Sequence, residues 1–137
     1  MDKFKNKKIH FIGIGGISMS AIANFLLDYK IKVTGSDLKF NDKIEELKSK
    51  GALIKIGHNE ENVKGADLVV ISSAIPEENP ELSYAKNNGI KIYKRAEMLA
   101  AIAGNKKLIA VSGSHGKTTI TGMLASIFVN AGMDPSI

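Results

Sequence analysis

The sequence predicts an α/β fold in which a doubly wound, Rossmann-like parallel sheet of about five strands lies between two layers of helices. Short apolar runs alternate with segments that have helical periodicity. Residues 67–71 (DLVVI) are almost wholly apolar, which is typical of a strand buried on both faces of a parallel sheet. Glycine-rich turns follow two of the apolar runs, where such folds bind anionic groups. Right-handed crossovers are expected between the strands.

The first elements are predicted to be a strand, a helix and a second strand. Residues 8–14 (KIHFIGI) form an apolar, β-branched run that ends in glycines. Residues 17–29 repeat apolar side chains at helical spacing, and the side chains expected on the buried face are Ile17, Ala21, Ile22, Phe25 and Leu26. Residues 31–34 predict a short second strand that leads into Gly35-Ser36-Asp37.

The same alternation continues along the chain. Asn41 is placed to N-cap a helix whose Ile44 and Leu47 face inward and which ends before Gly51. Three further strands are predicted, at residues 53–56, 67–71 and 90–93. Two further helices are predicted, at residues 80–88 and 95–103. The first of these has a proline at its start and a glycine after its end.

Residues 104–107 (GNKK) are the best candidate for a domain boundary. The strand–helix units before them are enough for a complete small domain. One apolar run (residues 108–111), a glycine-rich turn and one helical segment (residues 118–130) follow. A single strand and helix cannot bury a core of their own. We therefore expect one domain over residues 1–104 and the start of a second, truncated α/β domain over residues 105–137.

Composition excludes several classes of protein. The chain has 44% hydrophobic and 24% charged residues, which is a globular balance. There is no cysteine, so disulfides and thiolate metal sites are excluded. No apolar stretch approaches the roughly 20 residues of a membrane span, and no signal peptide is expected. The net charge of +5 fits a polyanionic nucleotide better than nucleic acid, because basic doublets are few and aromatic residues do not alternate with them.

The first candidate site is the glycine-rich turn after the first strand. It contains Gly13, Gly15, Gly16, Ile17 and Ser18, and it opens the first helix. The pattern is G-x-G-x-x-G with serine in the third glycine position. Glycines let backbone approach a diphosphate at the N-terminus of a helix. We therefore predict a diphosphate site, with a tight turn that binds no ligand as the alternative.

Other candidates follow the ends of later strands, where ligands bind in open parallel sheets. Asp37, about 20 residues past the glycines, stands where an acid bonds a ribose hydroxyl in dinucleotide folds, or it caps a turn. Ser72, Ser73 and Ala74 follow the strand at 67–71 and form either a base or sugar contact or an ordinary turn. His58 lies at the same edge, where a lone histidine is more often only a surface residue.

A second glycine-rich turn follows residues 108–111 and consists of Gly113, Ser114, His115, Gly116, Lys117, Thr118 and Thr119. It is shorter than the Walker A pattern, because Val111 stands where that pattern needs glycine. Its glycines and lysine predict a nucleotide triphosphate site, and a Thr hydroxyl can ligate Mg²⁺. His115 is expected to shape the loop rather than act as a base. The alternative is a glycine turn with an exposed lysine.

Taken together, these stretches resemble the Mur ligases of peptidoglycan synthesis. The matching segments are HFIGIGGISMSAIA (residues 10–23), VTGSD (33–37), GH (57–58), VVISSAIPEENPEL (69–82), RAEMLA (95–100) and VSGSHGKTT (111–119). The resemblance covers nearly the whole chain after Lys8. Ser18 replaces an expected glycine and Ser114 an expected threonine, and both replacements are small.

The resemblance implies a three-domain cytoplasmic enzyme, and within the family it is strongest to members that join L-alanine to UDP-N-acetylmuramate. The first domain would hold the UDP part of that substrate, and the second would bind ATP and Mg²⁺. ATP would convert the muramic acid carboxylate to an acyl phosphate, which the amine of L-alanine attacks. Because no later strand supplies the remaining groups, we expect this chain not to complete the ligation alone.

Carried over residue by residue, the resemblance also assigns roles. Gly13, Gly15 and Gly16 would meet the diphosphate, and Asp37, Ser73 and His58 would lie around the uridine. Lys117 would hold the outer phosphates of ATP and act in catalysis, and Thr118 would ligate Mg²⁺ ahead of Thr119.

Three other functions remain open on the sequence. A murein tripeptide ligase would use the same UDP-sugar. A regulatory NAD-binding Rossmann module would explain the first glycine turn and Asp37, but not residues 113–119. An α/β module for protein interaction would explain neither glycine turn.

Overall fold

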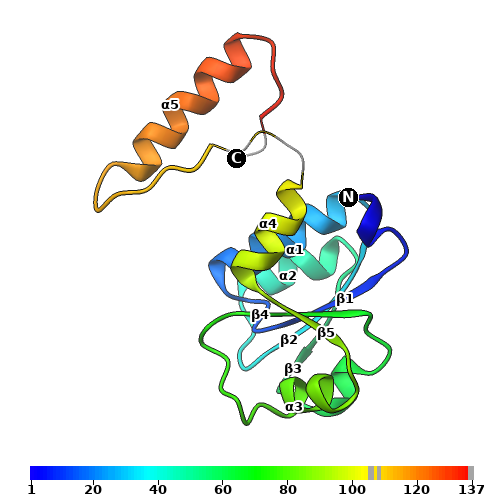
Figure 1. Cartoon of the computed structure of the whole chain (residues 1–137). Helices are drawn as coiled ribbons and strands as arrows, with labels where there is room; N and C mark the ends of the chain where they lie inside the picture. The colour runs from blue at the N-terminus through cyan, green and yellow to red at the C-terminus, as the bar shows by residue number, and fades with distance from the viewer. Residues whose placement is uncertain (105–106, 108, 136–137) are drawn as a thin grey trace. The chain divides into compact units, whose positions relative to one another are not determined.

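The computed structural model describes residues 1–104, 107 and 109–135, and the chain divides into two compact units, Met1–Gly104 and Asn105–Ile137. The first unit holds a parallel sheet of five strands in the order β3-β2-β1-β4-β5 (Figure 1). Its strands are β1 (Lys8–Ile12), β2 (Lys32–Asp37), β3 (Leu53–Ile56), β4 (Leu68–Ile71) and β5 (Lys91–Lys94). The predicted α/β parallel sheet is confirmed.

Helices cover both faces of this sheet. They are α1 (Ile17–Asp28), α2 (Asp42–Ser49), α3 (Pro80–Asn87) and α4 (Arg95–Ala103), with two 3₁₀ turns, η1 (Asp2–Phe4) and η2 (Glu60–Val63). Helices α1, α2 and α4 lie on one face, and α3 lies with η2 on the other (Figure 1). None of the described helices is long and apolar enough to cross a membrane.

The two faces of the sheet have separate hydrophobic cores. Alternation along β1 sends Ile9 and Phe11 into the core beneath α1, α2 and α4. Ile12 packs instead with Val69 and Leu82 in the core beneath α3. Buried polar side chains also lie on the α3 side of the sheet. That face therefore combines an apolar core with buried hydrogen bonds.

The face that α1 buries differs from the prediction. Met19, Ser20, Ile22, Ala23 and Leu26 are buried, whereas Ile17 is 78% exposed and Ala21 is exposed. Helical spacing alone leaves the direction of the buried face ambiguous in a helix that is apolar almost all round. The packing of α1 against β2, α2 and α4 decides it. The predicted cap at Asn41 is confirmed, because its side chain accepts a hydrogen bond from Ile44 N at 3.0 Å.

The second unit contains helix α5 (Lys117–Asn130), none of whose residues is buried. The strand predicted at residues 108–111 is not found at Ile109–Val111, and Leu108 lies outside the described residues. A strand exists only through pairing with a neighbour, and the described residues of this unit supply none. The functional assignment of residues 1–104 and 105–137 as domains stays a prediction.

Candidate functional site

All five strands are parallel, so their carboxyl ends meet at one edge of the sheet. Strand β1 lies between β2 and β4, and the chain therefore turns to opposite sides of the sheet from neighbouring strands at this point. Ligands of open α/β sheets bind in the crevice at such a switch point. The loop Gly13–Gly16, which joins β1 to α1, lies there.

The glycine loop is held by the end of β2. Gly13 has a φ of +80°, which favours glycine, and its N–H donates to Ser36 O at 2.8 Å. The N–H of Ile14 donates to the same carbonyl at 3.0 Å. The N–H of Gly15 donates to Oδ2 of Asp37 at 2.8 Å. These N–H groups are therefore used within the protein, and the glycines give the loop its shape.

A steric restriction explains why residue 15 is a glycine. A Cβ there would lie 2.9 Å from Oδ2 of Asp37 and 2.9 Å from Nδ2 of Asn41. Asn41 also donates from Nδ2 to Gly15 O at 3.1 Å. Gly15 is thus clamped from both sides by the residues that follow β2. A Cβ at Gly16 would meet only ordinary contacts, the nearest at 3.5 Å.

The first turn of α1 supplies the donors that remain available. The first backbone N–H bonded inside the helix is that of Ser20, which donates to Gly16 O at 2.8 Å. Within the described part of the chain, the N–H groups of Ile17, Ser18 and Met19 have no hydrogen-bond partner. Free donors at a helix N-terminus attract anions. The available donors are therefore those of Ile17, Ser18 and Met19, beside the glycines.

Arg95, the first residue of α4, adds a positive charge to this loop. Its Nη1 donates to the Ser18 hydroxyl at 3.0 Å. The serine in the third glycine position is thus the contact through which the guanidinium reaches the loop. Arg95 lies in a segment that carries the family resemblance (residues 95–100), but no local sequence pattern marks it as a site residue.

The loops after β3 and β4 reach the same edge. The N–H of Gly57 donates to Asp37 O at 2.8 Å, which places the turn before His58 beside the end of β2. Ser72 is half-buried and accepts from Ala74 N at 3.4 Å, while Ser73 and Ala74 are exposed. The structure brings Gly13–Ser18, Asp37, His58 and Ser72–Ala74 to one edge of the sheet.

A buried carboxylate, Glu81, lies beneath this edge on the α3 face. It is in the first turn of α3 and is fully buried. Its Oε2 accepts from His10 Nε2 at 2.9 Å and from Ser36 Oγ at 2.6 Å. Its Oε1 accepts from Asn59 N at 3.1 Å and from Asn62 Nδ2 at 2.8 Å. One side chain therefore ties together β1, β2, α3 and the segment around η2.

The hydrogen bonds keep Glu81 charged. Burial by itself raises the pKa of a carboxyl, but the donors from His10, Ser36 and Asn62 outweigh it and lower the pKa of Glu81 to about 2. The carboxylate is therefore ionised near neutral pH and is satisfied by the donors that surround it.

His58 belongs to the same network. Its Nδ1 lies 3.0 Å from Ser36 Oγ and 3.4 Å from Oε1 of Glu81, and its side chain is only 13% exposed. His58 is thus an oriented, nearly buried ring and not a free surface histidine. Sequence reasoning missed Glu81, Ser36 and His10. One signal was present: a histidine within an apolar strand needs a buried polar partner.

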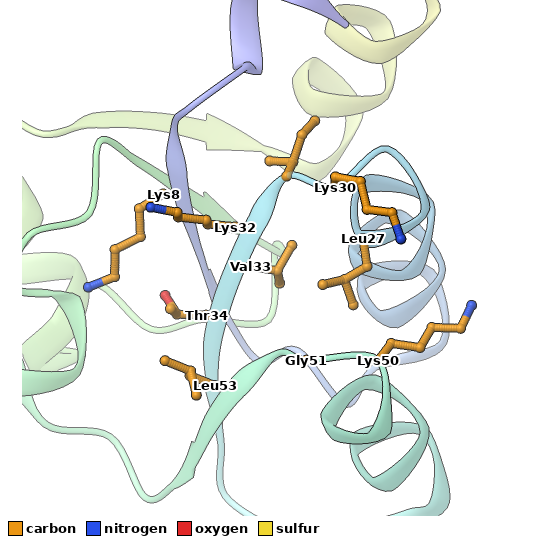
Figure 2. Close-up of a pocket in the computed structure, with 10 residues that line it drawn as sticks. Lys8, Leu27, Lys30, Lys32, Val33, Thr34, Lys50, Gly51 and Leu53 are labelled. Atoms are coloured by element: carbon orange, nitrogen blue, oxygen red, sulfur yellow. The ribbon is translucent and has the colours of Figure 1, made fainter.

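A separate cavity of about 340 Å³ lies at the opposite, amino edge of the sheet (Figure 2). Lysines line it beside Leu27, Val33 and Leu53. Two of them follow helix C-termini: Lys30 stands after α1 and Lys50 after α2. Cations at those ends offset the partial negative charge of the helix dipole. Lys30 and Lys50 therefore have a structural role, and the cavity lies away from the glycine loop.

In the second unit, residues 113–119 lead into the N-terminus of α5. Gly113 and Gly116 have positive φ values of 148° and 78°, and Gly116 is the N-cap residue. Lys117 Nζ donates back to Gly113 O. The hydroxyls of Thr118 and Thr119 have no partner among the described residues. Free hydroxyls and helix N–H groups beyond a glycine turn suit a phosphate group.

The side chains of this unit that could act as metal ligands also bear on Mg²⁺ binding. The described residues contain no cluster of three His, Asp or Glu side chains that could hold a metal ion. Mg²⁺ bound with a nucleotide takes only one or two protein ligands together with phosphate oxygens and water. A hydroxyl at Thr118 is compatible with that mode.

Comparison with known proteins agrees with this geometry. A family model described as "Mur ligase family, catalytic domain" matches residues 8–107. The chain is 54% identical over 136 residues to a UDP-N-acetylmuramate–L-alanine ligase of Clostridium botulinum (strain Eklund 17B / Type B), covering 98% of this chain and 30% of that protein.

Solved structures show the same similarity. A UDP-N-acetylmuramate–alanine ligase of Thermotoga maritima matches with a TM-score of 0.83 and 33% identity, over 92% of this chain and 30% of that one. A murein peptide ligase of Psychrobacter arcticus 273-4 matches with a TM-score of 0.85 and 31% identity, over 93% of this chain and 27% of that one. The chain spans about 30% of the length of the curated relatives. Because this family model matches most of its length, the chain belongs to the Mur ligase family.

Proposed function

We propose that this chain is the N-terminal part of a cytoplasmic ligase that joins L-alanine to UDP-N-acetylmuramate, and that its first unit binds the UDP portion of that substrate. The observation that carries the proposal is the glycine loop at the switch point, fastened to Asp37 and opening onto free helix N–H groups. The relatives named for this reaction share about half of their aligned residues with the chain.

The proposed contacts follow from the chemistry at the edge. The diphosphate meets the first turn of α1, where Ile17 N–H and Ser18 N–H donate and Arg95 supplies charge. Gly13, Gly15 and Gly16 bring the backbone close enough for this contact. Asp37 accepts from a ribose hydroxyl through Oδ1, which has only a long contact of 3.4 Å from Lys39 N, because its Oδ2 is held by Gly15.

The remaining residues at this edge are proposed to contact the nucleoside. His58 and Ser72–Ala74 lie around the uridine, at the ends of β3 and β4. These positions satisfy the rule that ligands of parallel sheets bind beyond the carboxyl ends of strands.

In the second unit, Gly113–Thr119 are proposed to hold the phosphates of ATP. Lys117 would stabilise the charge of the outer phosphates, and Thr118 would contribute an oxygen to Mg²⁺. ATP supplies the phosphoryl group that activates the muramic acid carboxylate. The isolated chain is expected not to turn over, because a complete ligase also needs groups that position the carboxylate and the amine.

A murein peptide ligase is the second candidate, because one such enzyme has a TM-score as high as that of the L-alanine ligase. UDP-N-acetylmuramate is the named substrate of solved structures of both kinds of ligase, so the proposed UDP site serves either. Comparing rates with L-alanine and with tripeptide in the full-length enzyme separates the two.

Calorimetric titration of the chain tests the UDP site. UDP and UDP-N-acetylmuramate are expected to bind with similar affinity, and NAD is expected not to bind. Tight binding of NAD without a response to either UDP compound would replace the proposal with a dinucleotide-binding module. Release of ADP by the isolated chain, with ATP, UDP-N-acetylmuramate and L-alanine present, would show that it is a complete enzyme.

A further inference from the structure

The network around Glu81 fixes which nitrogen of His58 carries the proton. Ser36 Oγ donates its only hydrogen to Oε2 of Glu81 at 2.6 Å. The contact of 3.0 Å between Ser36 Oγ and His58 Nδ1 therefore needs a hydrogen from the ring. Oε1 of Glu81, which lies 3.4 Å from Nδ1, is a second acceptor and also requires a hydrogen from the ring. A neutral His58 must carry its proton on Nδ1.

The other ring nitrogen of His58 is then an acceptor. Within the described residues, His58 Nε2 has no hydrogen-bond partner, and the ring is 13% exposed at the edge that carries Asp37. A neutral imidazole with its proton on Nδ1 presents a lone pair at Nε2. A ligand group that meets this atom must therefore be a hydrogen-bond donor.

We propose that Glu81 is a positioning residue, which fixes the Nδ1–H tautomer of His58 both through Ser36 and through its own Oε1, and so makes Nε2 an acceptor for a donor group of the bound uridine. The inference rests on the proposed function for its ligand. Two groups of uridine have the required chemistry: the imide N3–H of the base and the ribose hydroxyls. Glu81 acts without touching the ligand.

Replacing Glu81 by glutamine should invert this arrangement. The carboxylate accepts from four donors, two on each oxygen. A glutamine must place its NH₂ group on one side. The backbone N–H of Asn59 cannot become an acceptor, whereas Ser36 can rotate and His10 can change tautomer. The NH₂ group is therefore expected on the Ser36 side, and the freed Ser36 hydrogen turns toward His58 Nδ1.

The variant Ser36→Ala distinguishes an effect on the His58 tautomer from an effect of altered packing. It removes the hydroxyl but leaves Oε1 of Glu81 as the nearest acceptor for Nδ1–H. The ring is expected to keep its proton on Nδ1 in this variant. Glu78→Gln, which removes a charge from an exposed glutamate close in sequence, is the matched control for net charge.

Nitrogen-15 NMR of the histidine side chains at pH 8 reads the tautomer directly in the complete 137-residue chain without ligand. The wild-type chain, Ser36→Ala and Glu78→Gln are expected to show His58 with its proton on Nδ1, and Glu81→Gln to show it on Nε2. A wild-type ring protonated on Nε2, or on both nitrogens, would overturn the proposal. If Glu81→Gln fails to fold, the wild-type and Ser36→Ala spectra still decide the tautomer.

Titration with UDP and three analogues tests the consequence. Glu81→Gln is expected to weaken UDP binding about tenfold, the order of one lost hydrogen bond, and Glu78→Gln to leave it unchanged. N3-methyl-UDP, 2′-deoxy-UDP and 3′-deoxy-UDP then identify the donor: the analogue that lacks it binds the wild-type chain more weakly than UDP, but binds Glu81→Gln as UDP does.

The possible failures are distinguishable. If the wild-type chain discriminates against none of the three analogues, or if Glu81→Gln keeps the same discrimination, His58 does not accept from the uridine and the proposal is wrong. If the wild-type chain does not bind UDP at all, the proposed function fails, and the ligand half of this inference fails with it. The NMR result stands by itself in that case.

Discussion

The carboxylate of Asp37 and the backbone of Gly15 are joined by a hydrogen bond of 2.8 Å, across 22 residues of sequence. The acid that sequence reasoning placed at the ribose is therefore also a structural support of the glycine loop. One carboxylate oxygen, Oδ2, holds the loop, and the other, Oδ1, has only a long contact of 3.4 Å from Lys39 N and can accept a further hydrogen bond at the edge. Two substitutions can separate these roles.

Asp37→Asn is expected to keep the loop, because an amide oxygen can still accept from Gly15 N–H. Asp37→Ala leaves that N–H without its partner and is expected to cost about 1–3 kcal/mol of unfolding free energy. Urea denaturation of the two variants measures the difference. Both should bind UDP more weakly than wild type. Equal destabilisation by asparagine and alanine would contradict the support role.

Gly15→Ala should disturb the loop, because its Cβ would lie 2.9 Å from atoms of both Asp37 and Asn41. The expected loss is about 1–3 kcal/mol, as for overpacking elsewhere. Gly16→Ala, whose Cβ meets only ordinary contacts, is the control and should stay within about 0.5 kcal/mol. Thermal unfolding of the two variants measures the difference in stability. A Gly15→Ala chain as stable as wild type would show that the side chains of Asp37 and Asn41 move aside at little cost.

Arg95→Ala removes the cation that reaches the glycine loop through Ser18. The affinity for UDP is expected to fall about tenfold, comparable to one charge-assisted hydrogen bond. The affinity for uridine, which has no phosphate, should change little. Lys91→Ala removes a charge at the amino end of β5, the strand that precedes Arg95, and serves as control. An equal loss for UDP and uridine would place Arg95 away from the diphosphate.

Acid should destabilise the first unit through Glu81. The pKa of Glu81 is about 2 in the folded chain, against 4.5 for the same group in an unfolded chain. Between these pH values the folded state therefore binds fewer protons than the unfolded state. The stabilisation is complete above about pH 4.5 and is lost as the pH falls toward 2. The full effect is roughly 3 kcal/mol. Urea denaturation at pH 6 and pH 3 should show a shallower pH dependence for Glu81→Gln than for wild type, and an unchanged dependence would refute the ionised network.

Lys117→Ala tests the loop of the second unit. The lysine is exposed and is the first residue of α5, so its removal should not affect folding of the first unit. Any ATP affinity of the chain should fall at least tenfold, and UDP affinity should stay within twofold, because a lost phosphate contact acts only where phosphate binds. Calorimetry with each nucleotide provides both numbers. Unchanged ATP binding would place the phosphates elsewhere.

Much of the fold could be predicted because its signals are local. Apolar runs, helical spacing and the cap at Asn41 each depend on neighbours within a few residues. The strand at residues 53–56 and the helix at residues 95–103 have the predicted bounds. The buried face of α1 could not be predicted in the same way, since its apolar side chains are spread around the helix and long-range packing selects among them.

The sequence by itself determined the α/β class, the two glycine loops and the family resemblance, because each is written in residue types at short spacing. Only the tertiary structure decided how the candidate site is supported. Glu81 meets His10 across 71 residues and Ser36 across 45, and Arg95 meets Ser18 across 77. These partners come together because parallel strands and their crossover helices bring distant segments to one edge. A buried carboxylate there requires donors from every side, and no local pattern shows which residues supply them.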